Sequence, residues 1–233
     1  MKSTSFKADM KMIVREPMLI LFMIMPLFIY IIFKLIISFG EPLFLDLGVD
    51  LYDYYVYILG LSFLMAPMTL GTVAGFLMID EKDARIYELI SITPVGYFNY
   101  MVNRLLLPVV GCFLYTFIAY YILNIYDISQ GLLLFIALLT SINSIIMGLL
   151  LFSLADNKVK GLTYSKGFSM FNILALADIL NNKWFAIIAA VSPFYWVVRI
   201  IKFNDFSTVL MAIGVHLVWL FSIIRYSSTR NQS

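Results

Sequence analysis

Long apolar runs constrain this chain more than any other feature. Residues Tyr54 to Ile79 form a stretch of 26 positions without a charged side chain. A helix of that length is about 39 Å long, whereas the hydrocarbon core of a bilayer is about 30 Å thick. The whole chain is 62% hydrophobic and 13% charged, against about 25% charged in soluble domains. We therefore predict an all-α polytopic membrane protein, with residues 1–233 forming a single transmembrane domain.

The apolar segments predict six transmembrane helices. Five are clearly long and apolar enough to cross a bilayer. The sixth region, 162–180, is more polar, because Ser165, Lys166, Asn172 and other polar residues interrupt it. The expected spans are about 18–39, 54–79, 105–126, 132–155, 162–180 and 206–224.

Residues 184–202 are apolar but are broken at Ser192-Pro193. A proline lacks a backbone donor and disfavours helix at the residue before it. We therefore predict re-entrant helices before the last span, with a seventh span as the alternative. A break at membrane depth is tolerated only where protein or a cavity covers it.

The basic residues are unevenly distributed between the connections. Six spans place the N-terminus, the connections 80–104 and 156–166, and the C-terminus on one side, with 12 of the 16 lysines and arginines. The connection Gly40–Asp53 has four acids and no base. The positive-inside rule then predicts a multi-pass protein of the cell membrane with both termini in the cytoplasm.

The N-terminal stretch from Ser5 to Glu16 is amphipathic. Apolar residues recur at helical spacing, and a basic stripe of Lys7, Lys11 and Arg15 follows the same period. Such a helix lies in the membrane interface and attracts anionic lipid. We predict an interfacial helix that contacts the lipid bilayer; a simple topology anchor is the alternative.

The charged stretch from Asp80 to Arg104 lies between two expected spans. Its pattern predicts two short helices separated by Thr93-Pro94 and Gly96, with an apolar ridge framed by charges. That form suits a docking surface for a soluble partner. An ordinary solvated connection is the alternative.

Polar residues within spans are costly and often functional. The candidates for a substrate path are Thr69, Thr72, Ser169 and Asn172, although the threonines can also bond back to their own helix. His216 stands alone in the last span and is expected to be a packed, hydrogen-bonded residue. The small residues Gly71 and Gly75 favour close helix packing, either within the chain or between two copies.

Several motifs are missing from the sequence. It contains no G-x-x-x-x-G-K-[ST], no H-E-x-x-H and no G-x-S-x-G. We therefore expect no enzyme activity, no bound cofactor and no metal site in this chain. No cluster of lysine and arginine stands apart from the membrane flanks, which argues against nucleic-acid binding. The single cysteine, Cys112, excludes an internal disulfide.

Three segments resemble those of a known family. They are KMIVREPMLILFMIMPLFI at the first span, DEKDARIYELISITPVGYFNYMVNRLLLP after the second, and VSPFYWVV before the last. Together they resemble the membrane subunit of a type-2 ABC exporter, in the small drug or peptide subgroup. The resemblance implies that the second segment holds the cytoplasmic coupling helix, on which an ATPase docks. Its matching residues are Lys82, Asp83, Arg85, Ile86, Glu88 and Leu89.

The resemblance also implies partners. Two permease subunits, identical or not, would pair, and soluble ABC ATPase subunits would hold ATP and Mg²⁺. The short outer connections favour a hydrophobic or amphipathic cargo, such as a drug or a membrane-active peptide. The alternatives are a membrane scaffold or assembly factor, and an ATP-independent channel or secondary transporter.

Overall fold

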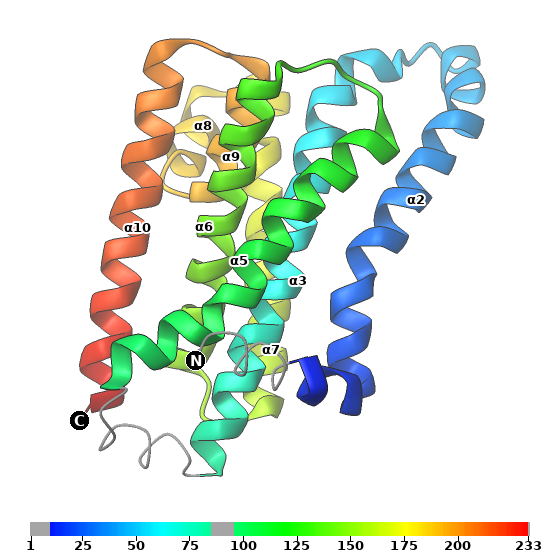
Figure 1. Cartoon of the computed structure of the whole chain (residues 1–233). Helices are drawn as coiled ribbons and strands as arrows, with labels where there is room; N and C mark the ends of the chain where they lie inside the picture. Colours follow the sequence, from blue (N-terminus) through cyan, green and yellow to red (C-terminus); the bar gives the residue numbers. More distant parts are fainter. Residues whose placement is uncertain (1–9, 85–95, 233) are drawn as a thin grey trace.

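The computed structural model describes residues 10–84 and 96–232. Within these ranges every element is a helix, and no strand is present (Figure 1). The all-α prediction is therefore confirmed for the described part of the chain. The upper end of Figure 1 holds the connections between α2 and α3, α5 and α6, and α9 and α10; the start of α2 and the end of α10 lie at the lower end.

Within residues 10–84 and 96–232, five helices are long and apolar enough to cross a membrane. They match five of the expected spans, with longer bounds than the hydropathy indicated. Helix α3 follows a short 3-10 turn, η1 (Leu51–Tyr54). The five helices are α2 (Pro17–Asp46), α3 (Tyr55–Asp83), α5 (Gly96–Leu123), α6 (Gln130–Leu154) and α10 (Phe206–Gln232).

The remaining expected span, 162–180, is not one α-helix. It is divided into α7 (Lys158–Ser169) and a 3-10 segment, η2 (Met170–Leu180), so none of the described helices there is long enough to count as a spanning candidate. The structure therefore shows five of the six expected spans as candidate spanning helices within the described residues. Gly161 and Gly167 lower the helix propensity of this stretch, and its serines bond back to the helix backbone. End to end, α7 and η2 are roughly 40 Å long.

The expected break at Ser192-Pro193 is present. Helix α8 (Lys183–Ala189) ends before it, and α9 (Pro193–Lys202) begins with the proline at its first position. Both helices are too short to cross a bilayer. Helix α9 is buried along most of its length and packs against η2, α3 and α10. This cover satisfies the condition for a helix break at membrane depth.

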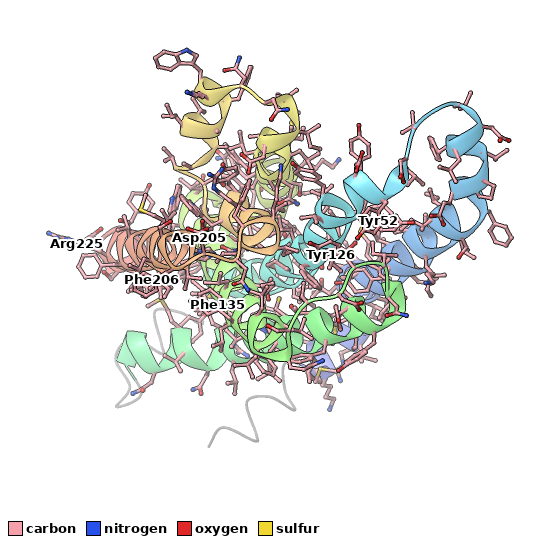
Figure 2. All side chains as sticks on the ribbon, turned by 90° about the horizontal axis from the view of Figure 1, so that it is seen from above. Tyr52, Tyr126, Phe135, Asp205, Phe206 and Arg225 are labelled. Carbon is pink, nitrogen blue, oxygen red and sulfur yellow. The ribbon has the colours of Figure 1, made fainter. Side chains whose placement is uncertain are left out.

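Helix α3 occupies the centre of the bundle and packs most closely on α6. Gly71 and Gly75 make that approach possible, because a Cβ atom added at Gly71 would lie 2.6 Å from Cβ of Met147. At Gly75 it would lie 2.8 Å from Cβ of Leu151. The small-residue motif therefore serves packing within the chain. Helices α2 and α10 lie on opposite sides of the bundle (Figures 1 and 2), and most of their side chains face outward.

The described parts of the stretch 80–104 belong to the two long helices that flank it, and residues 85–95 lie outside the described residues. The first residues of the stretch continue α3 to Asp83, and its last residues begin α5 at Gly96. Lys82 and Asp83 thus belong to the last turn of α3. The other docking residues expected from the resemblance, Arg85, Ile86, Glu88 and Leu89, lie outside the described residues.

The described part of the N-terminal stretch is helical from Met10 to Arg15. Ile13 is buried against α3, while Lys11 and Arg15 are exposed. This arrangement fits the amphipathic pattern. Lys7 lies outside the described residues.

Candidate functional site: a polar-lined cavity between helices α2, α3 and α7

All four residues expected to line a substrate path border one cavity. It measures about 490 Å³ and lies between α2, α3, α7 and η2. We call it the polar-lined cavity. Thr69 and Thr72 reach it from α3, Ser169 from the end of α7 and Asn172 from η2. The sequence did not reveal that two further residues of α7, Ser165 and Lys166, also border it.

The rest of the cavity wall is apolar. Its lining residues outside the polar set come from α2, α3 and α7: Leu21, Phe22, Met25, Ile29, Met65, Met68 and Leu162. No aspartate or glutamate is among the lining residues. Ligand sites are commonly mostly apolar, with a few placed polar groups. The methionines suit ligands of varied shape, because their side chains are flexible and polarisable.

The hydroxyl groups of the cavity bond to their own helices. Thr72 Oγ1 donates to the carbonyl of Met68 at 2.6 Å, and Ser169 Oγ donates to the carbonyl of Ser165 at 2.8 Å. Thr69 donates to Met65 at 3.1 Å. The expectation that the threonines bond back to their helix is confirmed. The threonines can still bind a ligand in the cavity, because each hydroxyl oxygen keeps a free acceptor lone pair.

A network of three charges lies at the lower end of the same helices. Lys158 Nζ, at the start of α7, is 2.5 Å from a Glu16 carboxylate oxygen and 2.7 Å from one of Asp80. Glu16 immediately precedes α2, and Asp80 lies near the end of α3. Partial burial opposes the charge of Lys158, but the two carboxylates raise its pKa above the ordinary value. One ammonium thus links the three helices that frame the polar-lined cavity.

A second charged cluster joins α3 to α5. The Glu81 carboxylate accepts hydrogen bonds from Tyr100 Oη at 2.6 Å and from Arg104 Nε at 2.9 Å, and it also contacts Arg104 Nη2. The side chains of Glu81 and Arg104 are only 5% and 13% exposed. Glu81 belongs to the charged stretch 80–104, for which the sequence predicted a docking surface for a soluble partner. Its burial explains why α3 continues past the expected end at Ile79.

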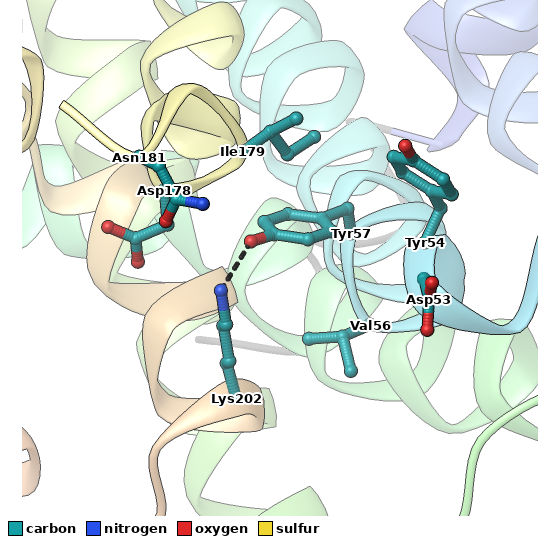
Figure 3. A pocket seen from close by; sticks show the side chains of 8 residues that line it. All are labelled: Asp53, Tyr54, Val56, Tyr57, Asp178, Ile179, Asn181 and Lys202. Atoms are coloured by element: carbon teal, nitrogen blue, oxygen red, sulfur yellow. Dashed lines mark hydrogen bonds between the residues drawn. The ribbon is translucent and has the colours of Figure 1, made fainter.

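The upper end holds a smaller pocket of about 260 Å³, shown in Figure 3. Lys202 Nζ donates to Tyr57 Oη at 2.7 Å across it (Figure 3). Nearby, Arg199 Nη1 is 2.9 Å from Asp178 Oδ1, and Tyr195 Oη donates to the same oxygen at 2.8 Å. These contacts fasten α9 to η2 and to the start of α3. No pairing of Asp178 with Arg199 was expected from the sequence.

His216 is fully buried in α10, and its Nδ1 lies 2.8 Å from the carbonyl oxygen of Ala212. It is the packed, hydrogen-bonded residue that the sequence predicted. Across residues 10–84 and 96–232, no three histidine, cysteine or acidic side chains gather where they could hold a metal ion.

The fold and the cavity together define a class of protein. A bundle of long apolar helices, five of them able to cross a membrane, encloses a mixed apolar and polar cavity between its helices. That is the architecture of a polytopic membrane permease. The chain belongs to the Rv2686c-like family, described as "Fluoroquinolones export permease protein Rv2686c-like", whose pattern it matches over residues 9–226.

Two curated relatives come from Mycobacterium tuberculosis. They are the fluoroquinolones export permease proteins Rv2686c, of strain H37Rv, and MT2760, of strain CDC 1551. Each is 25% identical to this chain over 202 residues, which covers 82% of this chain and 77% of the relative. No solved structure matches the chain. The family expected from the sequence, an export permease of the drug-efflux kind, is thereby confirmed.

Proposed function

We propose that this chain is the transport subunit of an ATP-driven ABC exporter, and that its cargo is an amphipathic drug of the fluoroquinolone kind. The family match over residues 9–226 is the observation that carries the proposal. ATP and Mg²⁺ would be held by a separate soluble ATPase subunit. A second permease subunit, identical or related, would complete the transport path.

The polar-lined cavity is the proposed cargo site. Its volume of about 490 Å³ lies within the range of about 300–1,000 Å³ typical of small-molecule sites. Apolar side chains from α2 and α3 suit a drug partitioned into the membrane, and the polar residues of α7 and η2 supply orientation. Thr69, Thr72, Ser169 and Asn172 are accordingly proposed to contact the cargo.

The proposed topology has six passes, with α7 and η2 together forming the fifth. Their combined length of roughly 40 Å exceeds the hydrocarbon thickness of about 30 Å. The charge distribution supports a cytoplasmic lower end with both termini, because Lys11, Lys82, Arg104, Lys158 and Arg225 all belong to that side. The helices α8 and α9 would then enter the outer leaflet and return.

We propose that the ATPase docks on the last turn of α3 and the stretch that follows it. Lys82, Asp83, Arg85, Ile86, Glu88 and Leu89 remain the candidate docking residues, on the strength of the resemblance. The cluster of Glu81, Tyr100 and Arg104 supports this placement, because it couples both ends of the stretch to the bundle. Movement of a docked ATPase would then be transmitted to α3 and α5.

Uptake into inverted membrane vesicles tests the export proposal. Vesicles holding the permease and its ATPase should accumulate a fluorescent fluoroquinolone only when ATP is supplied. Ser169→Trp should block this uptake, because the indole would fill the polar-lined cavity. Thr163→Trp is the matched control, since Thr163 is exposed on the same helix but does not border the cavity.

Two results would contradict the proposal. One is ATP-independent accumulation, which would favour a channel or secondary transporter. The other is equal uptake by the wild type, Ser169→Trp and Thr163→Trp, which would remove the cavity from the transport path.

Replacing Arg85 and Leu89 together should detach the ATPase or uncouple it from transport, without blocking membrane insertion.

A further inference from the structure

The hydroxyl groups of the polar-lined cavity are available to a ligand only as hydrogen-bond acceptors. Each hydroxyl uses its only hydrogen on a backbone carbonyl, as Thr69, Thr72, Ser165 and Ser169 all do. A hydroxyl in that state can only accept a further bond. The wall formed by α3 and α7 therefore offers acceptors to a bound molecule, and it favours a ligand with N–H or ammonium groups on that side.

Asn172 adds a stronger acceptor to the same wall. The residue is 7% exposed, and its Oδ1 has no hydrogen-bond partner within the described ranges. A buried acceptor without a partner is unfavourable, because it has lost its contact with water. A ligand donor that reaches Oδ1 would remove that penalty. Asn172 borders the cavity, so a molecule bound there would lie beside this side chain.

Lys166 is the one charged residue among those that border the cavity. It lies on α7, six residues before Asn172, and its side chain is exposed. In the described part of the chain no carboxylate forms an ion pair with it. Along the helix axis, Lys166 and Asn172 are roughly 10 Å apart. The cavity wall thus carries a cationic donor and a buried acceptor, roughly 10 Å apart along the helix axis.

We propose that Lys166 and Asn172 set the specificity of the polar-lined cavity by binding two different groups of the cargo. Lys166 Nζ pairs with a carboxylate or another anionic group. Asn172 Oδ1 and the hydroxyl oxygens accept hydrogen bonds from an amine or N–H group roughly 10 Å away. The apolar middle of the cargo packs against Phe22, Met25 and Met68. This inference rests on the proposed function, because it assigns roles within the same cargo site.

The test compares three probes that differ at one group each. The first is a fluorescent zwitterionic quinolone with a free carboxylate and a free amine. The second is its methyl ester, which lacks the anion, and the third is its N-acetyl derivative, which lacks the ammonium. Equilibrium binding to the purified permease in detergent and ATP-driven uptake into inverted vesicles are both measured.

Lys166→Gln should weaken binding of the zwitterion roughly tenfold, since a charge-assisted contact is lost. Binding of the methyl ester should not change. Asn172→Leu keeps a similar volume and should weaken the two probes that carry a free amine, but not the N-acetyl derivative. Lys160→Gln is the control for charge, because Lys160 is exposed on α7, pairs with Asp156 and does not border the cavity.

The outcomes separate this inference from the export proposal. If the wild type takes up no probe, the export assignment fails and the recognition scheme fails with it. If the wild type exports the probes but Lys166→Gln affects acid and ester equally, the recognition scheme alone is refuted. Lys166→Gln could instead have an effect only in vesicles of anionic lipid, and equally for all probes. That result would assign Lys166 to a lipid phosphate and would also refute the recognition scheme.

Discussion

The close contact of α3 and α6 gives a sharp quantitative prediction. A methyl group added by Gly71→Ala would lie 2.6 Å from Cβ of Met147 and 2.9 Å from the backbone oxygen of Ser144. Neither atom is the mobile end of a side chain, so the helices must separate. Overpacking of this kind costs about 1–3 kcal/mol. The same change also raises helix propensity by about 1 kcal/mol, which hides part of the steric cost.

Gly214→Ala isolates the steric cost. Gly214 lies within α10, and an added Cβ there meets nothing within 4 Å. The propensity gain is common to both variants and cancels when they are compared. We expect Gly71→Ala to be less stable than Gly214→Ala by about 1–3 kcal/mol. At about 2–4 °C per kcal/mol for a chain of this size, their unfolding temperatures should differ by several degrees.

Thermal unfolding in one detergent, at one heating rate, measures this difference. The fixed rate is needed because unfolding of membrane proteins in detergent is commonly irreversible, and the apparent midpoint then depends on the rate. Equal shifts for Gly71→Ala and Gly214→Ala would show that α3 and α6 are not in contact at Gly71. The central packing described above would then be wrong.

Three further predictions concern the charged residues. Glu81→Ala should cost about 3–5 kcal/mol of stability, because it leaves the buried guanidinium of Arg104 without this carboxylate. Adding Arg104→Met should recover part of the loss, as measured by thermal unfolding. No recovery in the double variant would contradict the pairing. Lys158→Met should cost at most about 1–2 kcal/mol of stability, because the two ion pairs of Lys158 are partly exposed. This loss should still be larger than the loss caused by the control Lys160→Met. A smaller loss than in the control would argue against the link between the three helices. Hydrogen bonds from Ser207 and Thr208 lower the pKa of Asp205 to about 2. The contribution of Asp205 to the stability of the folded protein should therefore be constant from pH 8 to 5 and decline as the pH falls through about 4 toward 2. The unfolding midpoint of the wild type relative to Asp205→Asn should follow that course, and a difference that changes between pH 5 and 8 would refute it.

The sequence predicted the parts of the fold that depend on local composition. Uninterrupted apolar runs located the five long helices, and Ser192-Pro193 located the break between α8 and α9. The helix ends do not follow from composition, because a charged residue such as Glu81 can continue a helix when a partner elsewhere in the chain pairs with it. Glu81 is an example: its partner Arg104 is 23 residues away, and no local pattern indicates that pairing. The extension of α3 to Asp83 therefore required the structure.

The sequence likewise predicted only part of the candidate site. Polarity within apolar segments singled out Thr69, Thr72, Ser169 and Asn172, and all four border one cavity. Lys166 was expected at the boundary between a connection and the interrupted span 162–180, and sequence alone does not give the direction of its side chain. The division of the fifth expected span into α7 and η2 places it beside the cavity. The signal in the sequence that pointed to this site was the unusual number of polar residues in the apolar segment 162–180.

Cargo protection of an introduced cysteine tests most directly whether the polar-lined cavity holds the drug. Ser169→Cys places a thiol at the cavity, while Leu138→Cys places one on an exposed position of α6, away from it. The native thiol of Cys112 is fully buried and should contribute little background. We predict that a saturating fluoroquinolone slows labelling of Ser169→Cys by a membrane-permeant maleimide and leaves Leu138→Cys unaffected. Equal labelling rates of Ser169→Cys with and without the drug would contradict the account.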